Sequence, residues 1–184
     1  MKSVLISIQP KWCELIANGK KLVEVRKTKP KIDVPFKCYI YCTKDNTFAE
    51  KTLRGFDDNG KAIYYKANKG KVIGEFVCDN IDAVIWLSNP TRLSWENTYN
   101  KDSCLTDNEL YNYSNGELFY KWHISDLVIY DKPKELGEFQ KHNRKAEDCE
   151  YEHLGLIAPR CSECDGCRVT RPFQSWGYVE ELGE

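Results

Sequence analysis

Long apolar runs, an excess of one charge and histidine pairs are all missing from this chain of 184 residues. No stretch approaches the roughly 20 apolar residues of a membrane span, and the apolar run within residues 1–10 is too short for a secretory signal. The formal net charge is -1, which excludes a global positive field that would attract a long polyanion. We therefore expect a cytoplasmic protein without a membrane segment, whose contacts with any nucleic acid are local.

Histidine occurs only three times, and no His-x-x-x-His pair or Ser-His-Asp arrangement can be read. His123 lies between Trp122 and Ile124 on an expected strand, where a hydrogen-bonded structural role is the usual one. A hydrophobic content of 41% in a chain of this length is enough for one core. We therefore predict a single domain over residues 1–184.

Strand-like segments dominate the chain, and one helix follows the first of them. Residues 3–8 are β-branched and aliphatic, which predicts a buried strand. Pro10 suits the first turn of a helix and Gly19 its end, and from Lys21 the apolar period changes to two. Further expected elements are strands over 37–43, 71–87 with a break at Asp79-Asn80, 119–130 and from Trp176, a hairpin or loop excursion over 44–70, and a short helix over 107–111. This pattern predicts an α+β fold, a small mixed β-barrel with helices packed on it.

Residues 19–26, GKKLVEVR, combine a helix end with a charged strand. On that strand Glu24 and Arg26 project to one face together with Leu22. Opposite charges can hold each other in place there, while the guanidinium keeps donors free for a phosphate or a base edge. Lys21 adds a mobile positive charge. The alternative is a solvated charged strand face, whose ion pairs contribute little to stability.

The same element resembles the signature of the ASCH domain, a helix followed by Gly-x-Lys-x-x-Glu-x-Arg, and the matching residues are Gly19, Lys21, Glu24 and Arg26. The segments KCYIYCT, GKVIGEFV and QSWGYVEEL look like later strands of such proteins, particularly of versions found in phages and prophages. ASCH domains are PUA-like, so the resemblance implies a small mixed β-barrel in which this element lines a ligand cleft. It also implies binding of RNA or of a nucleotide or nucleoside, modified ones included.

The last expected strand opens with Gln174, Ser175 and Trp176, which lie close to the first strand if the barrel closes as PUA-like folds suggest. Trp176 is either part of the core or able to stack on a base, a contact worth about 1 to 3 kcal/mol per base. We expect Arg26→Ala to weaken ligand binding with little change in melting temperature. The predicted ligand-binding residues are Lys21, Glu24, Arg26, Gln174, Ser175 and Trp176.

Catalysis is the alternative to binding. One branch of the family resembles an acetylcytidine amidohydrolase that uses a Lys and, three residues later, a Thr. Lys21 matches that Lys, but Glu24 replaces the hydroxyl nucleophile, which disfavours the reaction. A metal-free ribonuclease is also associated with ASCH domains, with phosphate stabilisation and proton transfer supplied by basic residues and a Tyr. If the protein is an enzyme, the candidate catalytic residues are Lys21, Glu24, Arg26 and Tyr41.

The nine cysteines form two groups. Five are scattered among apolar residues, where a reduced thiol is usually a small buried hydrophobe: Cys13, Cys38, Cys42, Cys78 and Cys104. Four gather near the C-terminus and are the predicted metal ligands: Cys149, Cys161, Cys164 and Cys167.

The last three cysteines of that second group are spaced three residues apart in a polar loop, which favours a structural Zn²⁺ site. Cys149 is then the best fourth ligand and His153 its substitute. An iron–sulfur cluster and a redox or free-thiol role are alternatives, although Arg171 occupies the fourth position of the ferredoxin run. We expect zinc to fold an insertion over residues 149–167 before the last strand. A second alternative function follows, in which this loop docks a protein partner.

Overall fold

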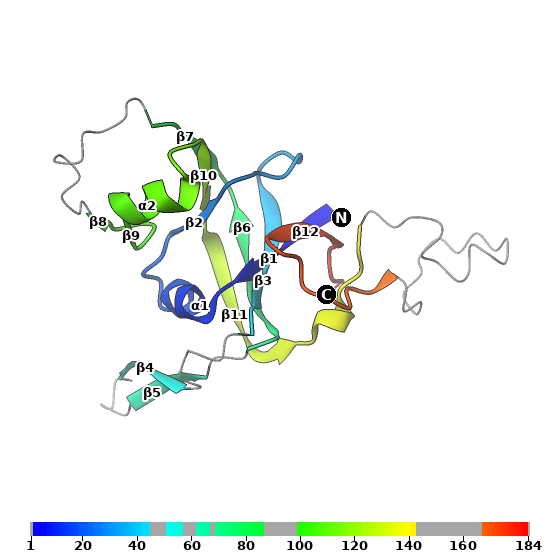
Figure 1. Cartoon of the computed structure of the whole chain (residues 1–184). Helices are drawn as coiled ribbons and strands as arrows, with labels where there is room; N and C mark the ends of the chain where they lie inside the picture. Colours follow the sequence, from blue (N-terminus) through cyan, green and yellow to red (C-terminus); the bar gives the residue numbers. More distant parts are fainter. Residues whose placement is uncertain are drawn as a thin grey trace, which may run out of the picture.

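The computed structural model describes residues 2–44, 51–56, 62–66, 69–86, 99–142 and 167–183 (Figure 1). Its elements in chain order are β1 (Lys2–Ile8), α1 (Pro10–Ala17), β2 (Val23–Arg26), β3 (Phe36–Cys42), β4 (Lys51–Phe56), β5 (Ala62–Lys66), β6 (Val72–Cys78), β7 (Ile81–Val84), β8 (Tyr99–Asn100), β9 (Leu105–Thr106), α2 (Asp107–Ser114), β10 (Phe119–His123), β11 (Ser125–Lys134), the 3-10 helix η1 (Leu136–Glu138) and β12 (Trp176–Glu180). The predicted α+β class is therefore confirmed. Within the described residues, no helix is both long and apolar enough to cross a membrane.

A five-stranded sheet with the order β11-β6-β3-β1-β12 forms the centre of the molecule. β1 runs parallel to β3, and the other neighbours are antiparallel. Both faces of β1 are covered, since Val4 and Ile6 pack in the cluster under α1 while Leu5 packs against Phe139 on the other face. A strand buried on both faces requires a continuous apolar run, which is what residues 3–8 supply.

A second sheet has the order β2-β10-β7. It joins the first sheet along one side, because β6 continues into β7 around Asn80 and β10 continues into β11 around Ile124. The amide of His123 donates to the carbonyl of Asn80 at 3.0 Å at this junction. The predicted break near Asp79-Asn80 is confirmed, and the expected strand over 119–130 is divided at Ile124.

The predicted closure into a barrel is not found, because no backbone ladder joins β2 to the β1–β12 edge among the described strands. Side chains span this seam instead. Nη2 of Arg26 donates to the carbonyl of Ser7 at 2.7 Å, as a strand amide would, and Nε1 of Trp176 donates to Oγ1 of Thr28 at 3.1 Å. Paired strands lie about 4.8 Å apart, so a guanidinium placed between two strands keeps their backbones too far apart for backbone hydrogen bonds.

The helix α1 begins at Pro10 and is followed by Gly19 with φ of 64°, a left-handed conformation that glycine adopts without strain. Cys13 and Ile16 on its inner face are buried in the main core cluster. The predicted helix and its end are therefore confirmed, and the sharp exit at Gly19 directs the chain toward β2.

The helix α2 begins with a reciprocal cap in which Thr106 and Glu109 each bond the other's backbone amide. Leu110 packs with Val25 and Phe119 in a small buried cluster. The expected short helix is confirmed and extends to Ser114. This packing holds α2 against the second sheet and sets its other side chains beside β2.

The predicted excursion after β3 contains the antiparallel pair β4–β5, with Lys51 opposite Lys66. The expected strand over 119–130 ends four residues short, since β11 extends to Lys134.

Candidate functional site

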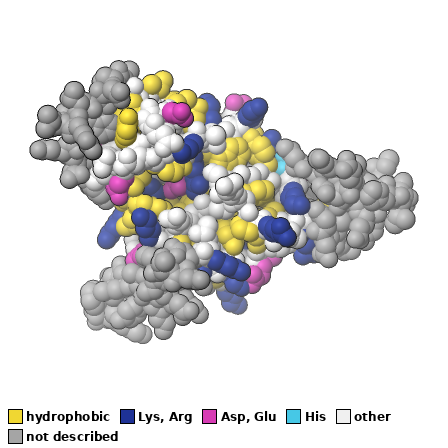
Figure 2. All heavy atoms as spheres, in the orientation of Figure 1, with side chains coloured by type: hydrophobic (Ala, Val, Ile, Leu, Met, Phe, Trp, Pro, Cys, Tyr) yellow, Lys and Arg dark blue, Asp and Glu magenta, His cyan; other side chains and the backbone are white. Residues whose placement is uncertain are grey.

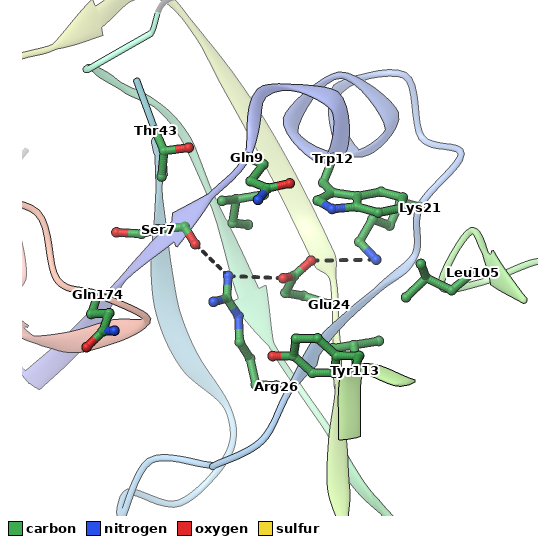
Figure 3. Close-up of a pocket in the computed structure, with 12 residues that line it drawn as sticks. Ser7, Gln9, Trp12, Lys21, Glu24, Arg26, Thr43, Leu105, Tyr113 and Gln174 are labelled. Carbon is green, nitrogen blue, oxygen red and sulfur yellow. Dashed lines mark hydrogen bonds and ion pairs between the residues drawn. The ribbon is translucent and has the colours of Figure 1, made fainter. Parts of the chain in front are cut away.

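A cleft of about 390 Å³ opens where the end of β1, the start of α1, the β2 segment and α2 meet (Figure 3). Its lining residues are Ser7, Ile8, Gln9, Trp12, Lys21, Glu24, Val25, Arg26, Thr43, Leu105, Tyr113 and Gln174. Lys21, Glu24 and Arg26 of the GKKLVEVR element therefore line one cleft together with Gln174, which lies more than 140 residues further along the chain.

Glu24 is the centre of a row of three charges. Its Oε1 lies 3.0 Å from Nη2 of Arg26, and its Oε2 lies 3.6 Å from Nζ of Lys21, as the dashed lines in Figure 3 show. The exposed fractions of these residues are 6% for Glu24, 8% for Arg26 and 2% for Lys21. The alternative of a solvated charged face is therefore wrong, and the row belongs to the buried ion pairs, in which a lost partner is costly.

Lys21, which precedes β2, is held by contacts with other segments of the chain. Its Nζ donates to the carbonyl of Ser103 at 2.7 Å and lies 5.1 Å from the centre of the Trp12 ring. Burial lowers the pKa of Lys21, and the carboxylate of Glu24 partly opposes that shift. The chain enters β2 only at Val23, so Leu22 does not share the face of Glu24 as expected and is 49% exposed.

Arg26 carries five N–H donors. Three of them are accounted for by the carbonyl of Ser7, the carboxylate of Glu24 and, at 3.3 Å, Oγ of Ser175. The Nε of Arg26 and the Oε2 of Glu24 are buried and have no hydrogen-bond partner within the described part of the chain. A donor and an acceptor on two paired lining residues thus lack a hydrogen bond within the described part of the chain, which normally costs about 1 to 3 kcal/mol for each such group.

The three residues predicted to open the last strand, Gln174, Ser175 and Trp176, differ in their positions, and β12 begins only at Trp176. Gln174 is exposed and lines the cleft, and Ser175 reaches it only through its bond to Arg26. Trp176 lies outside the lining, because its ring packs 5.8 Å from that of Trp122 and 5.4 Å from that of Tyr178. Of the two readings of Trp176, the structure favours packing over stacking on a base in the cleft.

Tyr41 is also outside the cleft. The alternation of β3 turns Ile40 toward α1 and Tyr41 toward the opposite face, where it is buried with Leu5 and Phe139. A role in proton transfer at the cleft is therefore excluded by its position. The tyrosine in the lining is Tyr113 of α2, which sequence reasoning missed.

Tyr113 and the other missed lining residues could be found only through their elements. In α2, Leu110 and Tyr113 are three residues apart and so lie on neighbouring parts of one helix face. Gln9 and Trp12 flank the start of α1, close to the charged row. Thr43 follows β3, whose pairing with β1 brings it to the same end of the sheet.

The five scattered cysteines are buried, as predicted, with exposed fractions of 0 to 9%. Burial raises the pKa of the Cys13 and Cys38 thiols well above the ordinary value.

Three of the four predicted zinc ligands, Cys149, Cys161 and Cys164, and the substitute His153 lie outside the described residues. Cys167 is fully buried, and its carbonyl accepts a bond of 2.8 Å from the amide of Lys141. No group of three or more metal-binding side chains occurs in the described ranges. The zinc site stays a prediction.

Comparison with known proteins identifies the fold. No protein-family model and no curated protein matches the chain. Among solved structures, ASCH from Zymomonas mobilis matches with a TM-score of 0.54 and 18% identity, over 97% of this chain and 88% of that one. A tyrosine-to-phenylalanine variant of that protein matches with a TM-score of 0.53 and 17% identity, over 98% and 92% of the two chains, and a serine-to-alanine variant with 0.54 and 17%, over 97% and 89%. The chain therefore has the ASCH fold that its GKKLVEVR element predicts, and the phage or prophage type stays a prediction.

Proposed function

We propose that the cleft binds a nucleotide or nucleoside, modified or not, either free or as part of RNA. One observation carries the proposal: Oε2 of Glu24 and Nε of Arg26 form an acceptor and a donor, both buried and without a hydrogen-bond partner among the described residues, in one cleft. Nucleobase edges present donors and acceptors side by side, which is the complement that such a pair of groups requires. The resemblance to ASCH domains supports the same class of ligand.

Charge and shape favour the same ligand. Two cations and one carboxylate leave the row with one excess positive charge, which attracts a phosphate. A volume of about 390 Å³ is within the range of small-molecule sites. Trp12 and Tyr113 lie on opposite sides of Glu24 in Figure 3 and bring aromatic rings into the lining, the side-chain type that proteins use to contact bases.

A nucleic-acid-directed enzyme is the second candidate, and one observation favours it. Burial lowers the pKa of Lys21, a property of amines that act as general bases. Against it, Lys21 is engaged by Ser103 and Glu24, and Glu24 is the residue that replaces the amidohydrolase nucleophile. Incubation with labelled RNA and with N4-acetylcytidine separates the two functions, because a binding protein leaves both intact.

The binding proposal is tested at the mouth of the cleft, where substitutions spare the buried row. Gln9 and Gln174 are exposed lining residues. We expect the double variant Gln9→Ala, Gln174→Ala to lose about tenfold in affinity for nucleoside 5′-monophosphates, since each lost hydrogen bond contributes about 0.5 to 1.5 kcal/mol. Titration calorimetry measures this, with Lys132→Ala on β11 as the control. Equal affinities for wild type, double variant and control would refute the site.

The C-terminal cysteines form a separate proposal, in which zinc folds residues 149–167 and this loop can dock a protein partner. Metal analysis of the purified protein is expected to find one Zn²⁺ per chain. Cys161→Ser with Cys164→Ser is the variant that removes two predicted zinc ligands. Cys167 is left unchanged because it is buried in the described structure. Zinc-free wild-type protein that keeps its fold would contradict the zinc assignment.

A further inference from the structure

Directly after Arg26, the KTKPK segment (residues 27–31) carries three lysines in five positions. Lys27, Lys29 and Lys31 are exposed, whereas Pro30 is buried and anchors the segment. Together with Tyr120 these residues line an open hollow of about 440 Å³, whose lining contains a single acidic side chain, Asp33. A chain of net charge -1 therefore concentrates positive charge at this position.

The segment is fixed by contacts that leave its ammonium groups available. The backbone amide of Lys31 donates to Oη of Tyr178 at 2.6 Å, and Thr28 accepts the bond from Trp176. Within the described residues, no carboxylate lies within ion-pair distance of Lys27, Lys29 or Lys31. Three lysines on a fixed segment are thus free to bind an anion.

Aromatic rings alternate with these lysines and connect the hollow to the cleft. Nζ of Lys27 lies 5.5 Å from the centre of the Tyr113 ring, which lines the cleft. Nζ of Lys29 lies 5.8 Å from the centre of the Tyr120 ring, which lines the hollow. A polymer that enters the cleft can therefore continue over the KTKPK segment without leaving the protein surface.

We infer that the ligand is a single-stranded nucleic acid, with one nucleotide in the cleft and its neighbours along the KTKPK segment. This inference rests on the proposed function. Backbone phosphates pair with Lys27, Lys29 and Lys31, and bases next to the bound one contact the rings of Tyr113 and Tyr120.

A single strand fits better than a duplex, since a base in a recessed cleft must first leave its stack, which costs least in a single strand. The rest of the surface supports a local contact of this kind. On the face drawn in Figure 2, Lys and Arg side chains occur at separate places with acidic side chains among them. A long duplex needs a continuous positive stripe to neutralise its phosphates. A few nucleotides of single strand need only the cleft and the three lysines beside it.

The test compares a polymer with its monomer. Lys29→Gln with Lys31→Gln removes two charges from the segment and spares Lys27, whose contact with Tyr113 reaches the cleft. The control is Lys132→Gln with Lys134→Gln on β11, at the opposite edge of the five-stranded sheet from β12. Lys134 also lies over a ring, that of Tyr130 at 5.4 Å, so the two pairs match in charge and in aromatic contact.

Affinities are measured by fluorescence anisotropy for eight-nucleotide RNA single strands and by calorimetry for nucleoside 5′-monophosphates. We expect the segment variant to lose about tenfold for the strand, with a salt slope shallower by about 1.4, because each phosphate contact contributes about 0.7. Its affinity for monophosphates stays within about twofold, since neither lysine lines the cleft and salt screens exposed charges. The control keeps both affinities.

The other outcomes separate the two proposals. Monophosphate binding without tighter binding of the strand, or equal losses in the segment variant and the control, overturns the inference and leaves the cleft proposal standing. Wild-type protein that binds neither probe overturns both. Polyglutamate is the probe for an acidic protein partner. If Tyr120→Leu weakens the binding of polyglutamate as much as that of the strand, the partner is an acidic protein and the inference is overturned. A loss of about fivefold or more in affinity for the strand alone supports nucleic acid, because only bases stack on the ring.

Discussion

Two sets of three charged residues follow one another within eleven positions and differ in their burial. Lys21, Glu24 and Arg26 are buried and bound to one another, whereas the lysines of the KTKPK segment are exposed. Both sets are equally polar in sequence. The difference is that β2, with the residues just before it, is an edge strand of the second sheet covered by other parts of the chain, while the KTKPK segment runs over the surface between β2 and β3.

Burial decides what each set can do. Removing one member of a buried ion pair leaves an uncompensated charge and costs about 3 to 5 kcal/mol, whereas an exposed charge contributes about 0 to 1 kcal/mol. In our proposal the row serves both the fold and the ligand, whereas the three ammonium groups of the KTKPK segment serve the ligand alone. Substitutions in the buried row should therefore cost more stability than substitutions of the exposed lysines.

Glu24→Ala is expected to have the largest effect on stability, about 3 to 5 kcal/mol, because it leaves both Lys21 and Arg26 buried without a counter-charge. Urea denaturation measures the free energy of unfolding. Glu117→Ala removes an exposed carboxylate on the loop after α2 and should change stability by no more than about 0.5 kcal/mol. A cost below about 1 kcal/mol for Glu24→Ala would place the row among surface charges.

Arg26→Ala is expected to cost about 2 to 4 kcal/mol, because it opens the seam at Ser7 and Ser175 while Lys21 still neutralises Glu24. Because Arg26 is buried, we expect its loss to lower the melting temperature, which the sequence alone had predicted to stay nearly unchanged. Arg26→Lys keeps the charge but not the fork of donors, so it should recover only part of the loss. Full recovery in thermal denaturation would show that charge alone matters at this position.

The pH dependence of binding separates Lys21 from the exposed lysines. Because burial lowers its pKa, Lys21 loses its proton at a pH below that of an ordinary lysine. Monophosphate affinity should therefore fall, by about tenfold, as pH rises through that lowered value. Calorimetry from pH 7 upward measures the fall, and Lys21→Met should abolish it. An affinity independent of pH in the wild type would exclude Lys21 from the site.

Rising pH, which is expected to weaken binding through Lys21, is expected to increase the contribution of Lys21 to stability. Between its lowered pKa and the ordinary value of 10.5, the unfolded chain binds the proton that the folded protein has released. The contribution of Lys21 to folding therefore becomes more favourable as pH rises through that window. A comparison of wild type with Lys21→Met in the same range isolates this contribution.

Lys29→Gln with Lys31→Gln is expected to have the smallest effect on stability, within about 0.5 kcal/mol, because neither ammonium has a carboxylate partner among the described residues. Urea denaturation of this variant beside Glu24→Ala compares the two sets directly. A loss of more than about 1 kcal/mol would mean that the segment also holds the fold together.

Local features of the sequence predicted much of this fold. Three features act over a few neighbouring residues, and each gives the expected structure. The β-branched and aliphatic residues within 3–8 form a buried strand, the proline at position 10 begins a helix, and the glycine at position 19 follows its end. The pairing of Glu24 with Arg26 also follows from spacing on one strand.

What depends on distant contacts could not be predicted from the sequence in this way. Burial of the row depends on Ser7, Ser103 and Ser175, none of which is near it in the chain. Tyr113 reaches the cleft because α2 packs on β2, and the barrel stays open because Arg26 occupies the seam.

The central claim is that a nucleobase bound in the cleft pairs with Nε of Arg26, a donor without a partner among the described residues. A titration of ¹⁵N-labelled protein with cytidine 5′-monophosphate, followed at the side-chain Nε–H of Arg26, tests it most directly. We predict a saturable shift of this signal together with signals of Gln174 and Tyr113. A signal of Arg26 Nε that stays unchanged while the protein is saturated with the nucleotide would contradict the claim.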